Sequence, residues 1–202
     1  MINDERFLKR FRLDIDNERF LAIKTQNKLR NDLGYTKQIE NVMSGLKNGK
    51  NYAFLGGVGL GKTICALEIV WRLKELDIDF RAFYSRYSII QTAHKANFGN
   101  LEKTLGAIFS KESYYYDDPP TRTGLVIIDE IHNADDFGLL NEIIFSGYDK
   151  LTPIILLGNC NSDDFSNIIS KMAMSRFLEN GTIISADGAD LRNIDKLAKM
   201  SI

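Results

Sequence analysis

The segment 56–63 reads Gly-Gly-Val-Gly-Leu-Gly-Lys-Thr, which matches the phosphate-binding loop pattern G-x-x-x-x-G-K-T. The residues at 52–55 are apolar and partly aromatic, as in a buried strand, and apolar residues recur after the loop at helical spacing. The pattern therefore predicts a loop between a strand and a helix, which is the context that phosphate binding requires. The alternative, an accidental glycine-rich turn, does not account for both flanking elements.

In such a loop, backbone N–H groups and the positive end of the following helix bind phosphate oxygens. Lys62 is expected to reach the β- and γ-phosphates, and the Thr63 hydroxyl is expected to ligate Mg²⁺. The predicted ligands are ATP or ADP with Mg²⁺. The predicted nucleotide-binding residues are Gly56, Gly57, Val58, Gly59, Leu60, Gly61, Lys62, Thr63 and Ile64.

Two carboxylates follow a run of four aliphatic residues at 125–128. The run is typical of a buried parallel strand, whose carboxyl end lies at the active edge of the sheet. Asp129 is predicted to hold Mg²⁺, usually through water. Glu130 is predicted to act as the general base on an attacking water. A surface turn could also carry this pair, but the phosphate-binding loop upstream favours the catalytic interpretation.

Asn159 follows a second buried strand, predicted at 153–157. Its amide could orient the attacking water or contact the γ-phosphate. It could equally cap the next helix together with Asn161 and Ser162. The spacing alone leaves both roles open.

Two late arginines are candidates for further phosphate contacts. Arg176 lies in a segment rich in apolar residues, where it could snorkel to the surface or reach a neighbouring subunit's nucleotide as an arginine finger. Arg192 is a weaker candidate for a second phosphate contact. The two histidines, His94 and His132, are interpreted as structural or surface residues.

Strands and helices alternate along the chain, which predicts an α/β fold with a parallel sheet and right-handed crossovers. The predicted architecture is a P-loop NTPase sheet flanked by helices. Residues 1–48 are predicted to form a helical N-terminal extension, and residues 49–202 the ATPase domain. The strands are expected near 52–55, 79–84, 125–128, 153–157 and 182–185.

The composition is that of an ordinary globular protein, with 44% hydrophobic and 26% charged residues. The net charge of −1 gives no overall basic field for nucleic acid. Residues 1–50, however, carry 11 Lys and Arg against 7 Asp and Glu, which fits a basic partner-binding arm, a helical cap on the sheet, or chance surface variation. Two cysteines without partner spacing and no long apolar run predict a cytoplasmic protein with no zinc site and no membrane span.

The motifs together resemble those of the AAA+ ATPases of the DnaC/IstB group. The phosphate-binding loop is followed by Leu-Val-Ile-Ile-Asp-Glu-Ile, Leu-Leu-Gly-Asn-Cys-Asn and Met-Ser-Arg-Phe, in this order, and the resemblance covers about residues 50–193. It implies a sheet ordered 5-1-4-3-2 and head-to-tail assembly into a ring or spiral. It assigns Asn159 to sensor 1, Arg176 to the arginine finger and Arg192 to the late arginine near the C-terminus. Because about ten residues follow Arg192, no C-terminal helical lid is expected.

The group includes bacterial and phage loaders of the replicative helicase. The resemblance therefore implies an ATPase that works in DNA replication, in a bacterial cell or a phage-infected host, and delivers a DnaB-family helicase to single-stranded DNA. The alternative is an IstB-like transposition regulator that binds duplex DNA, although a more basic body would be expected for it. Five residues either suit contacts with single-stranded DNA or form a core face with its solvated rim: Tyr84, Arg86, Tyr87, Lys95 and Phe98.

Overall fold

The computed structural model describes residues 38–75, 81–109, 123–133 and 137–186. Most of the predicted N-terminal extension and Arg192 lie outside these residues. The described elements, in chain order, are α3 (Ile39–Lys47), β1 (Asn51–Gly56), α4 (Lys62–Glu75), β2 (Arg81–Arg86), α5 (Tyr87–Ala96), α6 (Leu101–Phe109), β3 (Thr123–Asp129), the 3₁₀ helix η2 (Ile131–Asn133), α7 (Gly138–Asp149), β4 (Ile154–Gly158), α8 (Ser162–Ile168), α9 (Lys171–Glu179) and β5 (Gly181–Ala186).

The five described strands form one parallel sheet in the order β2-β3-β4-β1-β5. Read from β5 to β2, this is the order 5-1-4-3-2 that the resemblance implied, so the predicted α/β fold is confirmed. In a parallel sheet, all strands present their carboxyl ends at the same edge. Gly56, Asp129 and Gly158, the last residues of β1, β3 and β4, are therefore brought to one edge of the sheet although they are far apart in the sequence.

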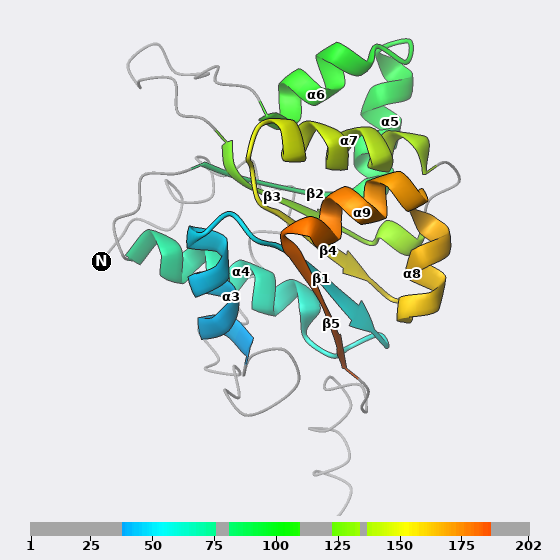
Figure 1. The fold of residues 1–202 in the computed structure, drawn as a ribbon. Helices are drawn as coiled ribbons and strands as arrows, with labels where there is room; N and C mark the ends of the chain where they lie inside the picture. The colour runs from blue at the N-terminus through cyan, green and yellow to red at the C-terminus, as the bar shows by residue number, and fades with distance from the viewer. Residues whose placement is uncertain (1–37, 76–80, 110–122, 134–136, 187–202) are drawn as a thin grey trace, which may run out of the picture.

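Helices cover both faces of the sheet and form a three-layered molecule (Figure 1). One buried cluster joins α3 and α4 to one face, and the other joins α5 to α9 to the opposite face. The central strands are buried on both sides, which explains why their inner residues are consecutively apolar instead of alternating with polar ones. Helix α3 packs on this body through its apolar face, with Ile39, Val42, Met43 and Leu46 all buried.

The apolar segment from Phe165 to Phe177 belongs to two helices, α8 and α9. The break occurs because Ile169 and Ser170 adopt extended backbone angles. The Ser170 hydroxyl then accepts a hydrogen bond from the Ala173 N–H at 3.1 Å and starts α9 as its N-cap. Since Ile169 is buried, the hydrophobic pattern continues across a break in the backbone.

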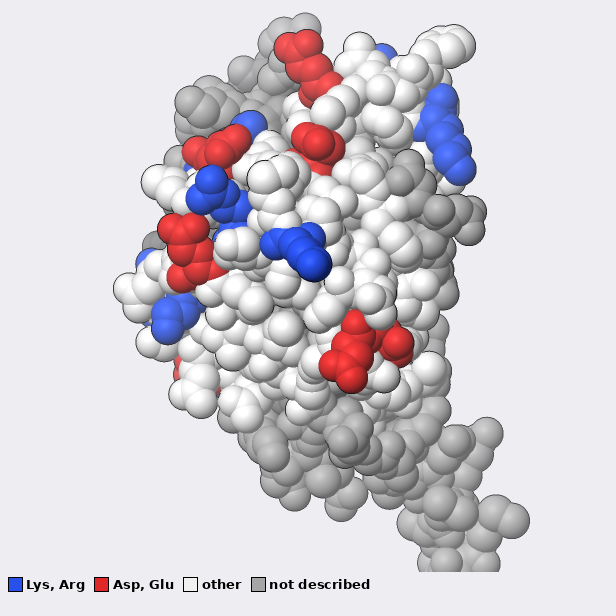
Figure 2. Space-filling view, turned by 45° about the vertical axis from the view of Figure 1, so that its right-hand side comes forward, with Lys and Arg blue, Asp and Glu red and all other residues white. Residues whose placement is uncertain are grey.

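The surface of the described residues carries charges of both signs in small groups. On the face shown in Figure 2, lysines and arginines are interspersed with acidic side chains, and no broad area of one sign is seen. None of the described helices is long and apolar enough to cross a membrane.

Candidate nucleotide-binding site

The loop between β1 and α4 has the backbone that a phosphate-binding loop needs. Gly56, Gly59 and Gly61 have φ angles of 137°, 79° and 83°, a region that glycine enters without steric cost. Helix α4 begins at Lys62, immediately after the last of these glycines. The predicted strand–loop–helix context is therefore present.

Lys62 folds back over this loop. Its Nζ donates hydrogen bonds to the carbonyl oxygens of Gly56 at 2.9 Å and Gly57 at 2.7 Å, and the residue is only 7% exposed. A buried ammonium group is costly unless it is hydrogen-bonded, and these carbonyls meet part of that need. The positive charge is thus held at the loop where the sequence predicts phosphate binding.

Asp129 links three parts of the site through its carboxylate. Its Oδ2 accepts hydrogen bonds from the Thr63 hydroxyl at 2.7 Å and from the Tyr84 hydroxyl at 2.8 Å. Its Oδ1 accepts from the Glu130 N–H at 2.7 Å. Burial, followed by the charge of Asp129, raises the pKa of Tyr84 well above its usual value, so the phenol stays protonated and remains a donor.

Thr63 and Asp129, the two predicted Mg²⁺ ligands, are therefore in direct contact. Both offer hard oxygen atoms, and Mg²⁺ is usually held by one or two such side chains together with water and substrate phosphates. Across the described part of the chain, no cluster of three or more His, Cys, Asp or Glu side chains could hold a metal by itself. The donor set fits Mg²⁺ bound together with a nucleotide.

Glu130 follows the end of β3 with a φ of 57°, which is uncommon for any residue other than glycine. Its Oε1 lies 3.7 Å from Nε of Arg86, the last residue of β2. Both side chains are substantially exposed. The predicted general base is thus at the solvent side of the site and already faces a cation.

The β4–α8 loop resolves part of the uncertainty over Asn159. Asn161 is the residue that caps α8, because its Oδ1 accepts from the Asp164 N–H at 2.7 Å. Asn159 instead contacts His132: its backbone N–H donates to Nδ1 at 3.1 Å, and its side-chain Nδ2 lies 3.3 Å from Nε2. Burial is the largest cause that lowers the pKa of His132.

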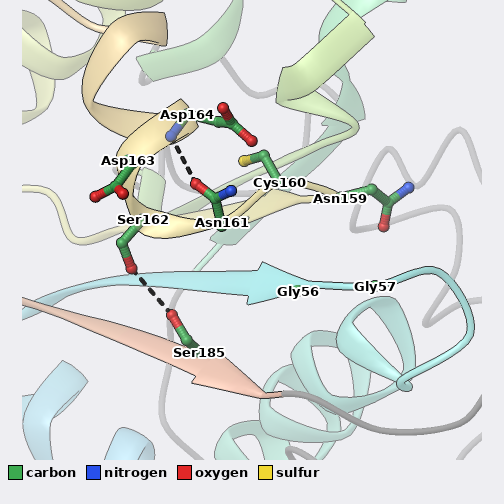
Figure 3. Close-up of a pocket in the computed structure, with 9 residues that line it drawn as sticks. All are labelled: Gly56, Gly57, Asn159, Cys160, Asn161, Ser162, Asp163, Asp164 and Ser185. Carbon is green, nitrogen blue, oxygen red and sulfur yellow. Dashed lines mark hydrogen bonds between the residues drawn. The ribbon is translucent and has the colours of Figure 1, made fainter.

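A cavity of about 510 Å³ opens beside the start of the phosphate-binding loop. Figure 3 shows the β4–α8 loop on one side, with the ends of β1 and β5 on the other. Its lining residues are Gly56, Gly57, Asn159, Cys160, Asn161, Ser162, Asp163, Asp164 and Ser185. The structure therefore brings the predicted loop and Asn159 to one concave surface.

Arg176 lies elsewhere. Its Nη1 donates to the Tyr148 hydroxyl at 3.1 Å, its guanidinium lies 4.6 Å from the centre of the Tyr148 ring, and Glu179 is 3.5 Å away. The neighbouring residue Phe177 accepts a hydrogen bond at its carbonyl from Asn51 Nδ2 at 3.2 Å, and Asn51 begins β1. Arg176 is therefore near the amino ends of the strands, opposite the phosphate-binding loop.

Two residues of this site were not singled out from the sequence. Tyr84 appeared only in a possible DNA-contacting group, and His132 was interpreted as structural or surface. Their partners lie 45 and 27 residues away, so no local pattern could identify the contacts. The available signal was position, since Tyr84 is near the end of a strand and His132 directly follows the two carboxylates and Ile131.

No family model matches this chain, and no curated protein sequence matches it either. Solved structures match its fold. The structure of DnaI has a TM-score of 0.57 and 15% identity, with 80% of this chain and 86% of that one covered. Domain III of the replication initiation protein DnaA from Thermotoga maritima has a TM-score of 0.59 and 18% identity, with 82% of this chain and 68% of that one covered.

A third structure, the replication initiator DnaA bound to AMPPCP and single-stranded DNA, has a TM-score of 0.55 and 19% identity. It is covered over 55% of its length, and 88% of this chain is matched. At these identities the similarity concerns the fold. The chain shares the fold of these replication proteins, and its strand order is the one that the resemblance to AAA+ ATPases implied.

Proposed function

We propose that this protein binds and hydrolyses ATP. The observation that carries the proposal is the contact between Thr63 and Asp129 beside a glycine-rich loop that encloses Lys62. These are the residue types that hold a nucleoside triphosphate and its metal in P-loop ATPases. The nucleotide in the similar DnaA structure, AMPPCP, supports the same assignment.

Each side chain has a separate task in the proposed reaction. Lys62 and the loop N–H groups bind the phosphates and stabilise the charge that develops on them. Thr63 and Asp129 would hold Mg²⁺, which supplies further neutralisation of that charge. Glu130 accepts a proton from the attacking water. Asn159 orients the water or contacts the γ-phosphate.

Nucleotide binding is tested by thermal unfolding with millimolar Mg²⁺ and ATP or ADP. At about 100 times the Kd, binding to the folded state adds about 2.7 kcal/mol, which corresponds to a rise of roughly 5–10 °C in Tm for a chain of this size. Lys62→Ala should abolish the rise. An unchanged wild-type Tm would refute the nucleotide site.

Hydrolysis is tested with Glu130→Gln in the same buffer. The amide cannot accept a proton, so turnover should fall by about 10²–10⁴, while the nucleotide-dependent rise in Tm remains. Turnover at the wild-type rate would show that Glu130 is not the base.

We further propose that the ATPase works in DNA replication, as a loader of a DnaB-family helicase. The DnaI and DnaA folds among its structural neighbours support this proposal, as does the basic character of residues 1–50. Residues 1–34 would be the helicase-binding arm. Their deletion should leave nucleotide binding intact, because the phosphate-binding loop and every described strand lie beyond them, and should abolish capture of the helicase in a pull-down. Retained capture would refute the arm.

Single-stranded DNA is the proposed nucleic-acid partner. Of the five residues considered from the sequence, Tyr84 and Tyr87 are buried and belong to the core. Phe98 is fully exposed at the turn between α5 and α6, and Lys95 is exposed nearby in sequence. An exposed ring with an exposed cation close in sequence suits stacking on a base with a phosphate contact. Duplex binding of the IstB kind is less well supported, because residues 51–202 carry 15 Lys and Arg against 20 Asp and Glu and a more basic body would be expected for it.

Self-association completes the proposal. Strand β1 has six residues and so spans roughly 17–20 Å, which separates Arg176 from the phosphate-binding loop of its own chain. If Arg176 stabilises the charge on a transferring phosphate, it must act on the nucleotide of another subunit. A contact of that kind joins different surfaces and builds a ring or a spiral.

A further inference from the structure

His132 contacts both the main chain and the side chain of Asn159. The Asn159 N–H lies 3.1 Å from Nδ1 of the imidazole, and the side-chain amide lies 3.3 Å from Nε2. The two residues come from different elements, η2 and the loop after β4, and are joined across the active edge of the sheet. The contact therefore connects the segment after the predicted catalytic carboxylates to the predicted sensor residue.

The main-chain contact fixes the chemical state of the ring. A backbone N–H can only donate, so Nδ1 must be the acceptor and carries no proton. A neutral imidazole with a bare Nδ1 carries its proton on Nε2. Nε2–H is then a donor, and the group of Asn159 that can accept from it is Oδ1. A half-turn of the amide, which exchanges its oxygen and nitrogen, satisfies this requirement.

We propose that His132 is a positioning residue that fixes the side-chain amide of Asn159, with Oδ1 turned to the imidazole and the NH₂ group left as the donor for the γ-phosphate. Without His132, the amide could present either end, and its oxygen would repel a phosphate. The contact itself is independent of the enzyme activity. Its catalytic consequence rests on the proposed ATPase function.

Close packing makes the contact a rigid one. A Cβ atom at Gly158 would lie 2.9 Å from Cys160 Sγ and 3.1 Å from Ile131 Cγ1, so the end of β4 and the start of η2 are pressed together. Ile131 is fully buried and Gly158 is the last residue of β4. His132 and Asn159 each directly follow one of these packed residues, so neither backbone can shift without disturbing the core.

The first test is the tautomer of His132, read from long-range ¹H–¹⁵N NMR correlations. The chain has only two histidines, so His94→Gln leaves His132 as the sole imidazole. We expect a protonated Nε2 and an unprotonated Nδ1 in the folded protein. We also expect the Asn159 N–H to be protected from hydrogen exchange, with protection lost in His132→Ala and kept in His132→Asn, whose Oδ1 lies near the position of Nδ1. The Nδ1–H tautomer, or an Asn159 N–H whose protection is the same in His132→Ala, would overturn the proposal.

The second test is a double-mutant cycle on ATP turnover. His132→Ala should lower kcat by about ten- to a hundredfold, the range found when partners that orient a working group are removed, with little change in ADP affinity. His132→Gln, whose side-chain amide N–H can replace Nε2–H as the donor to Asn159 Oδ1, should recover more of the loss than His132→Asn, which keeps only the acceptor for the main-chain N–H. Adding His132→Ala to Asn159→Ala should cost nothing more, because the two act as a unit.

The outcomes separate this proposal from the proposed function. Full additivity in the cycle, or an equal loss of ADP affinity, would overturn the positioning role even if the tautomer is as expected. If the wild-type protein has no turnover, the ATPase proposal fails, and the NMR measurements alone decide whether His132 holds Asn159.

Discussion

The two edges of the parallel sheet are built differently. At the carboxyl edge, Lys62, Thr63 and Asp129 are joined to each other or to the loop by hydrogen bonds of 2.7–2.9 Å within one chain. At the amino edge, Arg176 is held by Tyr148 and Glu179 and touches no residue of the site. The difference teaches that one chain assembles the residues proposed to bind a nucleotide but leaves its candidate arginine finger on the opposite side.

The burial of the two edges differs in the same way. Asp129 and Lys62 are 8% and 7% exposed, so their interactions lie in a medium where charges interact strongly. The side chain of Arg176 is 48% exposed, and an ion pair at such a surface is worth little. Arg176 can therefore leave Tyr148 and Glu179 at low cost, whereas the contacts of Asp129 are expected to persist.

The largest expected effect is the loss of ATP turnover when Arg176, at the amino edge, is removed. Arg176→Ala should lower ATP turnover by about 10³, the size of effect seen for arginine fingers, and should leave ATP affinity nearly unchanged because Arg176 does not touch its own loop. Turnover is measured at protein concentrations high enough for assembly. Mixing Arg176→Ala with Glu130→Gln should restore part of the activity, since some interfaces then pair an intact base with an intact arginine.

Lys171→Ala is the matched control, since Lys171 is an exposed cation on the same helix and should have no effect. Wild-type turnover in Arg176→Ala would contradict the proposed action of Arg176 on a neighbouring subunit. So would activity per subunit that stays constant on dilution to monomer. Either result would make the chain a self-contained enzyme.

An intermediate effect is expected from removing one hydroxyl at the buried edge. Tyr84→Phe leaves the carboxylate of Asp129 with one donor fewer, and a hydrogen bond to a charged group contributes about 1.5–3 kcal/mol. We expect the free energy of unfolding, measured in urea without nucleotide, to fall by about 2 kcal/mol. A change below about 0.5 kcal/mol would mean that the hydrogen bond from Tyr84 does not stabilise the carboxyl edge.

The smallest effect is expected from the corresponding tyrosine-to-phenylalanine substitution at the exposed amino edge, Tyr148→Phe. Tyr148→Phe removes the hydroxyl that accepts from Arg176 and lies 3.1 Å from Glu179, but it keeps the ring on which the guanidinium packs. The free energy of unfolding should change by no more than about 0.5 kcal/mol, as for most surface substitutions. A loss as large as that of Tyr84→Phe would show that Arg176 is firmly held.

The sequence was sufficient for the fold because its signals are local. Aliphatic runs such as 125–128 mark strands buried on both faces, and the glycines of 56–61 mark a loop that needs positive φ angles. The same signals placed Thr63 and Asp129 correctly at one edge. The start of α5 carries no such signal, because the helix begins at Tyr87 after an extended Arg86 without a side-chain cap.

The remaining features depend on contacts between distant segments. Tyr84 was open to a role on the surface until the sheet order placed β2 beside β3, which brings its hydroxyl to Asp129. His132 and Asn159 meet for the same reason, across β3 and β4. The roles of Asn159 and Arg176 in catalysis stay predictions, because they require a bound nucleotide and a second subunit.

The backbone of Glu130 has a consequence for how this chain can change by mutation. A left-handed conformation costs a non-glycine residue about 1–2 kcal/mol, and asparagine tolerates it better than glutamate does. A selection for heat resistance alone should therefore favour asparagine at position 130, at the expense of the proposed general base. Folding stability and turnover pull this position in opposite directions, so the glutamate would persist only in lineages where ATP hydrolysis is under selection.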